Sequence, residues 1–161
     1  MSTPRPAPSG SANPEIRALS EALQAEHAAV YGYGVAGGRL TGAARTQART
    51  ALDTHRARRD TIARLITDRG AAAPAAAPAY TIPFPVGTPA DATRLAVHLE
   101  DGVAVRLGEL VALAGAPLRN EAAGWLRETA VWAVRWRGTS TPFPGLPAST
   151  EPGTPTAGGR T

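Results

Sequence analysis

"AAAPAAAPAYTIPFPVG", Ala71–Gly87, is the stretch that decides the architecture of this chain of 161 residues. Its prolines, at positions 74, 78, 83 and 85, recur too often for a regular helix, because proline lacks a backbone N–H and clashes with the preceding turn. The segment is also too apolar for a free linker, through Tyr80, Ile82, Phe84 and Val86. Roughly 17 extended residues reach up to about 55–60 Å, whereas a helix of about 25 residues is about 37 Å long. We therefore expect the segment to lie along a helical bundle and to cross its whole length.

Two helices are predicted before this crossover. The first begins at Asn13-Pro14-Glu15, with an N-cap, a proline and an acid in the first turn, and should end near Leu40. Its stripe has helical spacing and consists of Leu19, Leu23, Glu26, Val30, Tyr33 and Gly37. The second runs from about Arg45 to Arg69 before Gly70, with the stripe Ala48, Leu52, His55, Arg59, Ile62 and Ile66. The short connection "TGAA" makes the two helices antiparallel neighbours.

Two more helices are predicted after the crossover. The capping sequence Thr88-Pro89-Ala90-Asp91 opens the third, whose stripe is Ala96, Glu100, Val103, Leu107, Leu110 and Ala114. Pro117 starts the fourth, whose stripe is Glu121, Trp125, Glu128, Trp132 and Arg135. Residues 13–138 are thus predicted to form an all-α, ferritin-like four-helix bundle: two antiparallel hairpins joined by a long Pro-rich crossover.

Both ends of the chain differ from the bundle in composition. Residues 1–12 are Pro, Ser, Thr, Ala and Gly with one charge, and we expect them to be disordered. Residues 139–161 form a Pro/Gly/Thr-rich tail that cannot be helical. Within the tail, residues 143–147 carry Phe143 and Leu146, which can dock on the bundle, and we expect the chain beyond Ala148 to be mobile.

Composition narrows the setting and the function classes. The chain has no cysteine, which excludes disulfides, thiolate metal sites and cysteine nucleophiles. Its start, "MSTPRPAPSGSA", lacks the apolar region of a signal peptide, and no apolar run approaches the roughly 18 residues that span a bilayer. We therefore expect a cytoplasmic protein that does not associate with a membrane. The net charge is +4, but all 17 basic residues are Arg, as GC-rich coding produces, and acids are interspersed among them. Nucleic-acid binding is accordingly not expected.

The stretch "AEHAAVYGYGVAGGRL", Ala25–Leu40, contains a G-x-G-x-x-G pattern at Gly32, Gly34 and Gly37. A dinucleotide fingerprint needs a strand before it and a helix start after its first glycine. Here the glycines lie in the second half of a predicted helix, so that interpretation fails. We favour a structural reason, either close approach of a neighbouring segment or room for aromatic rings. Thinning of the helix for a ligand or a gating motion is the alternative.

Each predicted helix places one polar residue inside its apolar stripe near mid-length, namely Glu26, His55, Glu100 and Glu128. In a bundle, these four residues lie at the same level along the bundle axis, whichever direction each helix runs. Such groups are costly in a core unless they are paired, hydrogen-bonded or bound to metal. We favour a buried network in which Arg59 pairs with Glu26 or Glu100 and Arg135 pairs with Glu128. The alternative is a metal site formed by the same four residues.

Several short motifs, taken together, carry a resemblance to a known family: "AEHAAVYGYG", "HRARRD", "PAYTIPFPV", "LAVHLEDGVA" and "WAVRWRG…PFPGLP". Over about residues 14–147 the chain resembles the small actinobacterial ferritin-like domain family of uncharacterised function. The resemblance implies a ferritin-like fold, a bacterial cytoplasmic setting and no established activity. The wider superfamily includes di-iron and di-manganese carboxylate proteins, which use one Glu on two helices and E-x-x-H on the other two.

This metal motif carries over incompletely. Glu26 and Glu100 match the two single glutamates. His55 would be the histidine of an E-x-x-H, but Leu52 stands three residues before it, and Val131 rather than His follows Glu128 by three. The resemblance therefore does not imply a standard di-iron site.

No pattern in the sequence assigns a catalytic or cofactor-binding residue, since G-x-S-x-G, a P-loop and a Ser/His/Asp set are all missing. The favoured hypothesis is a non-catalytic structural or interaction protein that forms a homo-oligomer, with no cofactor and with its protein partner unidentified. The second hypothesis is an iron or manganese protein with a degenerate site. The third is a basic module that binds polyanions through the arginines of the second helix.

Overall fold

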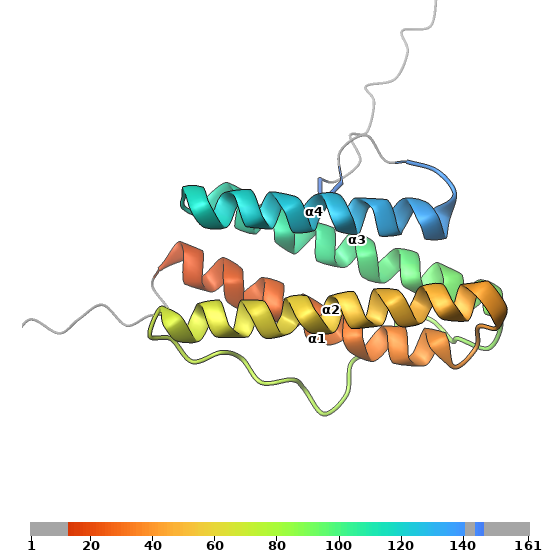
Figure 1. The fold of residues 1–161 in the computed structure, drawn as a ribbon. Coiled ribbons are helices and arrows are strands. Elements are labelled where there is room, and N and C mark those ends of the chain that lie inside the picture. Colours follow the sequence, from red (N-terminus) through yellow and green to blue (C-terminus); the bar gives the residue numbers. More distant parts are fainter. Residues whose placement is uncertain (1–12, 141–143, 147–161) are drawn as a thin grey trace, which may run out of the picture.

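The computed structural model describes residues 13–140 and 144–146, and within them all regular structure is helical. The helices are α1 (Pro14–Gly37), α2 (Gly42–Asp68), α3 (Pro89–Leu113) and α4 (Ala116–Arg137), and they form the four-helix bundle of Figure 1. The prediction of an all-α four-helix bundle is confirmed. The disorder expected for residues 1–12, the docking of Phe143 and the mobility beyond Ala148 fall outside the described residues.

The helix ends follow local signals in the sequence. The side chain of Asn13 accepts a hydrogen bond from the backbone N–H of Glu15 at the start of α1. Thr88 and Asp91 form a complete capping box at the start of α3. Gly138 ends α4 with a φ of 81°, a conformation that glycine adopts without strain. α1 ends at Gly37, before the predicted end near Leu40, and α2 begins at Gly42, three residues before the predicted start at Arg45, so the short connection lies three residues earlier than expected.

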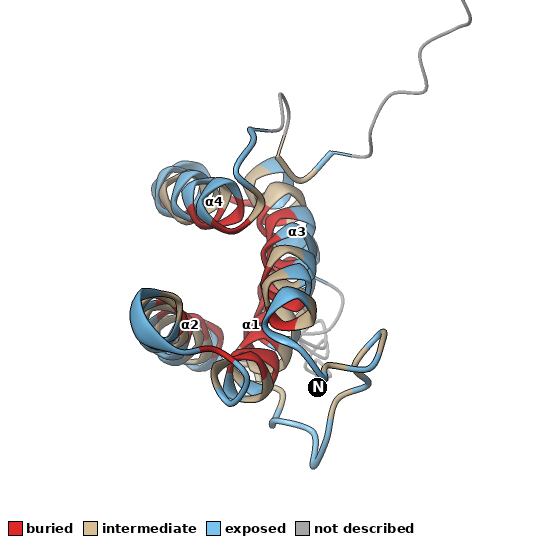
Figure 2. Cartoon of the chain, turned by 90° about the vertical axis from the view of Figure 1, so that its right-hand side faces the viewer, coloured by how far each residue is buried: buried red, intermediate tan, exposed pale blue. Residues whose placement is uncertain are grey.

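α1 packs against α2 and α3, and α3 also packs against α4, whereas α2 and α4 approach each other less closely. The end-on view in Figure 2 shows this arrangement, with the buried residues on the inward faces. Figure 1 shows that α2 and α3 run in the same direction, with the connection between them lying along the outside of the bundle. This is the topology that the long crossover predicts.

Apolar and polar contacts hold the crossover on the bundle. Its residues Ile82, Phe84 and Val86 pack against a buried cluster at one end of the molecule. His27 on α1 hydrogen-bonds the carbonyl of Pro74 at 3.2 Å, and Nε of Arg39 donates to the carbonyl of Val86 at 3.1 Å. The crossover is therefore a packed element of the fold.

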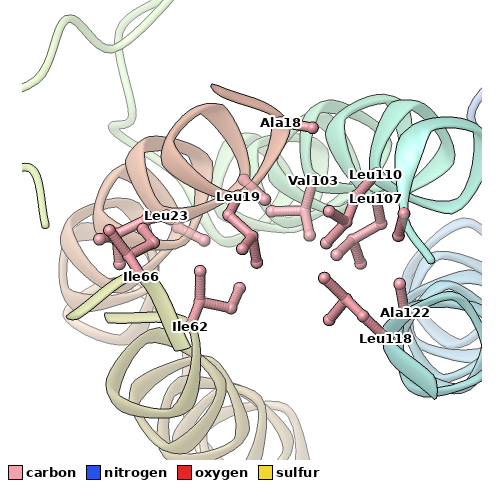
Figure 3. Packing of buried hydrophobic residues seen from close by; sticks show 13 residues of the cluster. Ala18, Leu19, Leu23, Ile62, Ile66, Val103, Leu107, Leu110, Leu118 and Ala122 are labelled. Atoms are coloured by element: carbon pink, nitrogen blue, oxygen red, sulfur yellow. The ribbon is translucent and has the colours of Figure 1, made fainter. Parts of the chain in front are cut away.

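The hydrophobic core consists of two clusters. Figure 3 shows the first, which draws on all four helices and includes Leu19, Leu23, Ile62, Ile66, Leu107 and Leu110. The second includes Tyr33, Leu40, Leu95, Trp132 and Trp136. On α2, α3 and α4, the residues of the two clusters are separated along the helix by buried polar residues: His55 and Arg58 on α2, Glu100 on α3 and Thr129 on α4. A polar layer thus divides the core at mid-height.

Candidate functional site

Three of the four polar residues singled out in the sequence are fully buried: Glu26, His55 and Glu100 each have an exposed fraction of 0%. They come from α1, α2 and α3, at places where helical spacing would otherwise put an apolar side chain. A carboxylate or an imidazole without hydrogen-bond partners is costly in a protein core. The hydrogen bonds of these three residues therefore determine whether the layer is a paired network or a metal site.

His55 lies between the two buried carboxylates. Its Nδ1 is 2.7 Å from Oε2 of Glu26, and its Nε2 is 3.1 Å from Oε1 of Glu100. Burial by itself lowers the pKa of His55, but hydrogen bonds to Glu100 and Glu26, together with their negative charges, outweigh it and raise the pKa to about 9. The ring is therefore an imidazolium at neutral pH and donates a hydrogen bond from each nitrogen.

A buried arginine supplies the second positive charge of the layer. Nη1 of Arg58 donates to Oε1 of Glu26 at 3.0 Å and to Oγ1 of Thr129 at 2.9 Å, while Nη2 donates to Oε2 of Glu128 at 2.6 Å. Arg58 is only 3% exposed. Its guanidinium joins α2 to both α1 and α4, although α2 and α4 do not pack closely against each other.

The predicted role of Arg59 in this network is wrong. Arg59 pairs with its neighbour Asp60 at 2.8 Å, and its side chain is 29% exposed. Viewed along α2, positions 58 and 59 lie on opposite sides of His55, about 100° apart. Position 58 reaches Thr129 and Glu128 of α4, whereas, among the described residues, the side chain at position 59 pairs only with its neighbour Asp60.

Glu128 lies at the edge of the layer rather than inside it. Its side chain is 48% exposed, although its carboxylate receives the hydrogen bond from Arg58. The buried polar residue of α4 is its neighbour Thr129, with an exposed fraction of 0%. The inward face of α4 is therefore offset by one residue from the stripe that the sequence predicts. Arg135, the other arginine considered for Glu128, instead stacks on the ring of Trp132.

Two aromatic residues extend the network beyond Glu100. The Tyr33 hydroxyl donates to Oε1 of Glu100 at 2.5 Å, and Nε1 of Trp136 donates to the Tyr33 oxygen at 2.8 Å. The Tyr33 ring also stacks on His55 at a centroid distance of 5.2 Å. Burial, followed by the charge of Glu100, raises the pKa of Tyr33 well above its ordinary value of 10.0, so the phenol stays neutral. Tyr33 lies two helical turns from Glu26 on the same stripe, which is the signal that could have placed it here.

The buried charges balance one another. Two negative carboxylates, Glu26 and Glu100, face two positive groups, His55 and Arg58, while Glu128 adds a negative charge at the solvent edge. Two polar atoms of the layer lack a partner among the described residues, Nε of Arg58 and Oε2 of Glu100. The layer is thus neutral in its interior and nearly complete in its hydrogen bonds.

This arrangement does not fit a metal centre of the carboxylate–histidine kind. A metal ligand must be deprotonated and have a free lone pair, whereas both nitrogens of His55 are directed at carboxylates. Within residues 13–140 and 144–146, no group of three or more His, Asp or Glu residues is arranged to hold a metal ion. Among the buried carboxylate oxygens of these residues, only Oε2 of Glu100 has no hydrogen-bond partner.

Comparison with known proteins places the chain in a family. Residues 18–148 match the family described as "Domain of unknown function (DUF4439)". The chain belongs to this family. The crystal structure of a conserved hypothetical protein, rv2844, from Mycobacterium tuberculosis is similar, with 38% sequence identity and a TM-score of 0.76. That match covers 78% of this chain and 96% of the other. No curated protein matches the chain.

The structural match supports the four-helix fold of this DUF4439 member, and the family description assigns no activity to it. Within the described residues, none of the helices has the length and hydropathy that a segment crossing a bilayer needs.

Proposed function

We propose that this DUF4439 protein is a non-catalytic, ferritin-like bundle with a structural or interaction role, in which a charged layer takes the place of a di-metal site. The observation that supports this most is the pairing of Glu26 and Glu100 with the cationic side chains of Arg58 and His55. These two groups supply the positive charge that metal ions would supply to buried carboxylates.

The position of the two cations supports the same conclusion. Arg58 reaches Oε1 of Glu26 and His55 reaches Oε2, so both oxygens of this carboxylate are in use. A metal ion could bind Glu26 only after one of these partners had withdrawn. Withdrawal of the guanidinium would leave a buried charge without its partner, at a cost of about 3–5 kcal/mol.

One atom favours the alternative function, a degenerate iron or manganese site. Oε2 of Glu100 is buried and has no hydrogen-bond partner among the described residues, as a ligand oxygen would be before it meets its metal. In that alternative Glu26, His55, Glu100 and Glu128 would hold the ion. Glu128 would then have to exchange its hydrogen bond with Arg58 for the metal.

Elemental analysis of protein purified without chelator separates the two functions. The proposal predicts fewer than about 0.1 iron or manganese ion per chain. It also predicts no change of melting temperature on adding either ion, because a ligand that binds only the folded state would raise it. Stoichiometric metal, or turnover of O₂ or peroxide by the iron-loaded protein, would overturn the proposal in favour of the alternative.

We also propose that the protein acts in the cytoplasm as a homo-oligomer. Support for self-association comes from large apolar side chains on the outer surface of α3, α4 and the tail, with exposed fractions between 37% and 65%: Val105, Val131, Val134 and Leu146. Light scattering coupled to size-exclusion chromatography tests this part. A monomer at all concentrations, unchanged by the single substitution Val131→Glu, would contradict it.

A further inference from the structure

A hollow of about 280 Å³ lies between the C-terminal half of α1 and the N-terminal half of α2. Gly34 and Gly37 of α1 and Arg45, Arg49 and Leu52 of α2 line it. The buried ring of Tyr33 lines it as well, so the hollow adjoins the aromatic end of the charged layer.

The two arginines of this hollow differ from most others in the structure. The side chains of Arg45 and Arg49 make no hydrogen bond or ion pair with any described residue, and no acidic side chain lines the hollow. On the same helix, by contrast, Arg56, Arg58 and Arg59 each pair with a carboxylate. The first turn of a helix carries a partial positive charge, which disfavours cations there. Arg45 lies in the first turn of α2, so helix stability does not account for it.

Packing within the chain also does not explain the glycines on the α1 side of the hollow. A Cβ added at Gly34 or Gly37 would meet nothing within 4 Å, so the packing of the chain does not require glycine there. Gly32 is different, because its Cβ would lie 2.6 Å from Cδ1 of Leu99. Glycine inside a helix is less stable than alanine, yet Gly34 stands inside α1. What the missing side chains at 34 and 37 provide is open space against the backbone.

We propose that this hollow binds a small organic oxyanion. Arg45 and Arg49 hold its phosphate, sulfate or carboxylate group through charge-assisted hydrogen bonds, for which the guanidinium fork is well suited. A flat apolar part of the molecule lies over Gly34 and Gly37 and contacts Leu52. The volume of 280 Å³ falls at the lower end of the range for ligand sites, about 300–1,000 Å³, so the occupant is small. This site is separate from the charged layer and goes beyond the proposed structural role.

Titration calorimetry with phenyl phosphate tests the site, with inorganic phosphate and phenol as the two halves of the same molecule. Phenyl phosphate should bind more tightly than either half. Arg45→Gln and Arg49→Gln should each weaken it about tenfold or more, since a hydrogen bond to a charged group is lost. Gly34→Leu should abolish binding while leaving the melting temperature unchanged or higher, because leucine is the better helix former.

Two matched variants serve as controls. Arg64→Gln removes an exposed arginine elsewhere on α2, and Gly102→Leu fills an exposed helical position on α3 where a Cβ also meets nothing within 4 Å. Both should bind phenyl phosphate like the unaltered protein.

Three results would overturn the proposal. The first is no binding of phenyl phosphate, and the second is binding that Arg45→Gln, Arg49→Gln and Gly34→Leu do not change. The third is equal binding of inorganic phosphate that survives Gly34→Leu, which would mean adventitious anion binding only. A mixed-sequence oligonucleotide is measured in parallel. If the oligonucleotide binds and phenyl phosphate does not, and if Arg64→Gln weakens oligonucleotide binding as much as Arg45→Gln does, the arginines form a general polyanion-binding surface and not this site.

Discussion

Nη1 of Arg58 lies 3.0 Å from Oε1 of Glu26, and Nη2 of the same guanidinium lies 2.6 Å from Oε2 of Glu128. One side chain of α2 therefore connects α1 with α4, although α2 and α4 themselves pack less closely than the other neighbouring helices. A buried pair of this kind adds little net stability compared with an apolar pair. Removing one partner alone is costly, because the other charge stays buried.

Arg58→Met should therefore lower the free energy of unfolding by about 3–5 kcal/mol, since Glu26 then keeps only His55 as its partner. The melting temperature should fall by about 10 °C or more. Arg59→Met is the matched control. Its guanidinium pairs with Asp60 at the surface, so the loss should stay below about 1 kcal/mol. Urea denaturation measures both variants, and equal losses would contradict the assignment of Arg58 to the layer.

The pairing of Glu26 with Arg58 can be isolated by a double-mutant cycle. Glu26→Gln keeps the shape of the side chain but leaves two buried cations facing one carboxylate, which should cost on the order of 3 kcal/mol. Adding Arg58→Met should restore part of that loss, because one of the two orphaned charges disappears. The same values are expected with and without chelator. Losses that simply add would show that the two side chains do not interact.

Stability should decrease as the pH rises above neutrality. The pKa of His55 is raised to about 9 in the folded protein, above its ordinary value of 6.5, by the carboxylates of Glu100 and Glu26. The stabilisation is fully present below about pH 6.5 and is lost as the pH passes through about 9. The shift of roughly 2.5 pKa units corresponds to a loss on the order of 3 kcal/mol. Within the layer, the raised pKa of Tyr33 keeps its phenol neutral over this range.

Thermal unfolding between pH 6 and pH 10 measures this loss, and His55→Gln is its control. The variant should be less stable at pH 6 and should show a much flatter decline toward pH 10. Nitrogen-15 NMR of the ring of His55 should show both nitrogens protonated at pH 7. A neutral ring at pH 7 would contradict the assignment of a positive charge to His55.

The helices could be predicted because their signals are local. Asn13 and the Thr88–Asp91 capping box start helices where the sequence places them, and the prolines of residues 71–87 exclude any helix between α2 and α3. The start of α2 was missed by three residues. Gly42 has a φ of 54°, so the chain turns at this glycine and the helix follows at once.

The site was only partly predictable, because its partners depend on distances between helices. Periodicity identifies the stripe that holds Glu26, His55 and Glu100, and all three are buried there. It cannot distinguish Arg58 from Arg59, which flank that stripe on opposite sides. That choice follows from the wider separation of α2 and α4, a property of the folded bundle. For the same reason, periodicity predicts Glu128 as the α4 residue of the layer, although its neighbour Thr129 is the buried one.

Two glycines of α1 should respond in opposite ways to alanine. At Gly32 a Cβ would lie 2.6 Å and 2.7 Å from the two methyl carbons of Leu99, which must shift, so Gly32→Ala should cost about 1 kcal/mol through overpacking. At Gly34 the space is open, and Gly34→Ala should stabilise the protein by about 0.5–1 kcal/mol. Adding Leu99→Ala to Gly32→Ala should recover part of the loss. Chemical denaturation measures these three variants, and a stabilising Gly32→Ala would show that α1 and α3 are not in close contact there.

Residues 144–146 of the tail lie against the outer surface of α3 and α4, where Gly145 comes close to the backbone of Ala104. Gly145 has a φ of 82°, and a Cβ there would lie 2.5 Å from the carbonyl oxygen of Ala104, which as helix backbone cannot move aside. Gly145→Ala should therefore release this segment, because the left-handed conformation alone costs an alanine about 1–2 kcal/mol.

Methyl NMR measures the release through the signals of Leu146 and Val105, which line the same hollow. Both signals should shift in Gly145→Ala, while the melting temperature of the bundle changes by less than about 2 °C, because residues 144–146 lie outside the four helices. Gly138→Ala is the control, since Gly138 has a similar φ of 81° but open space around its Cβ position. That variant should weaken the end of α4 and leave the two methyl signals in place. Unshifted signals in Gly145→Ala would mean that the contact with Ala104 does not hold the tail.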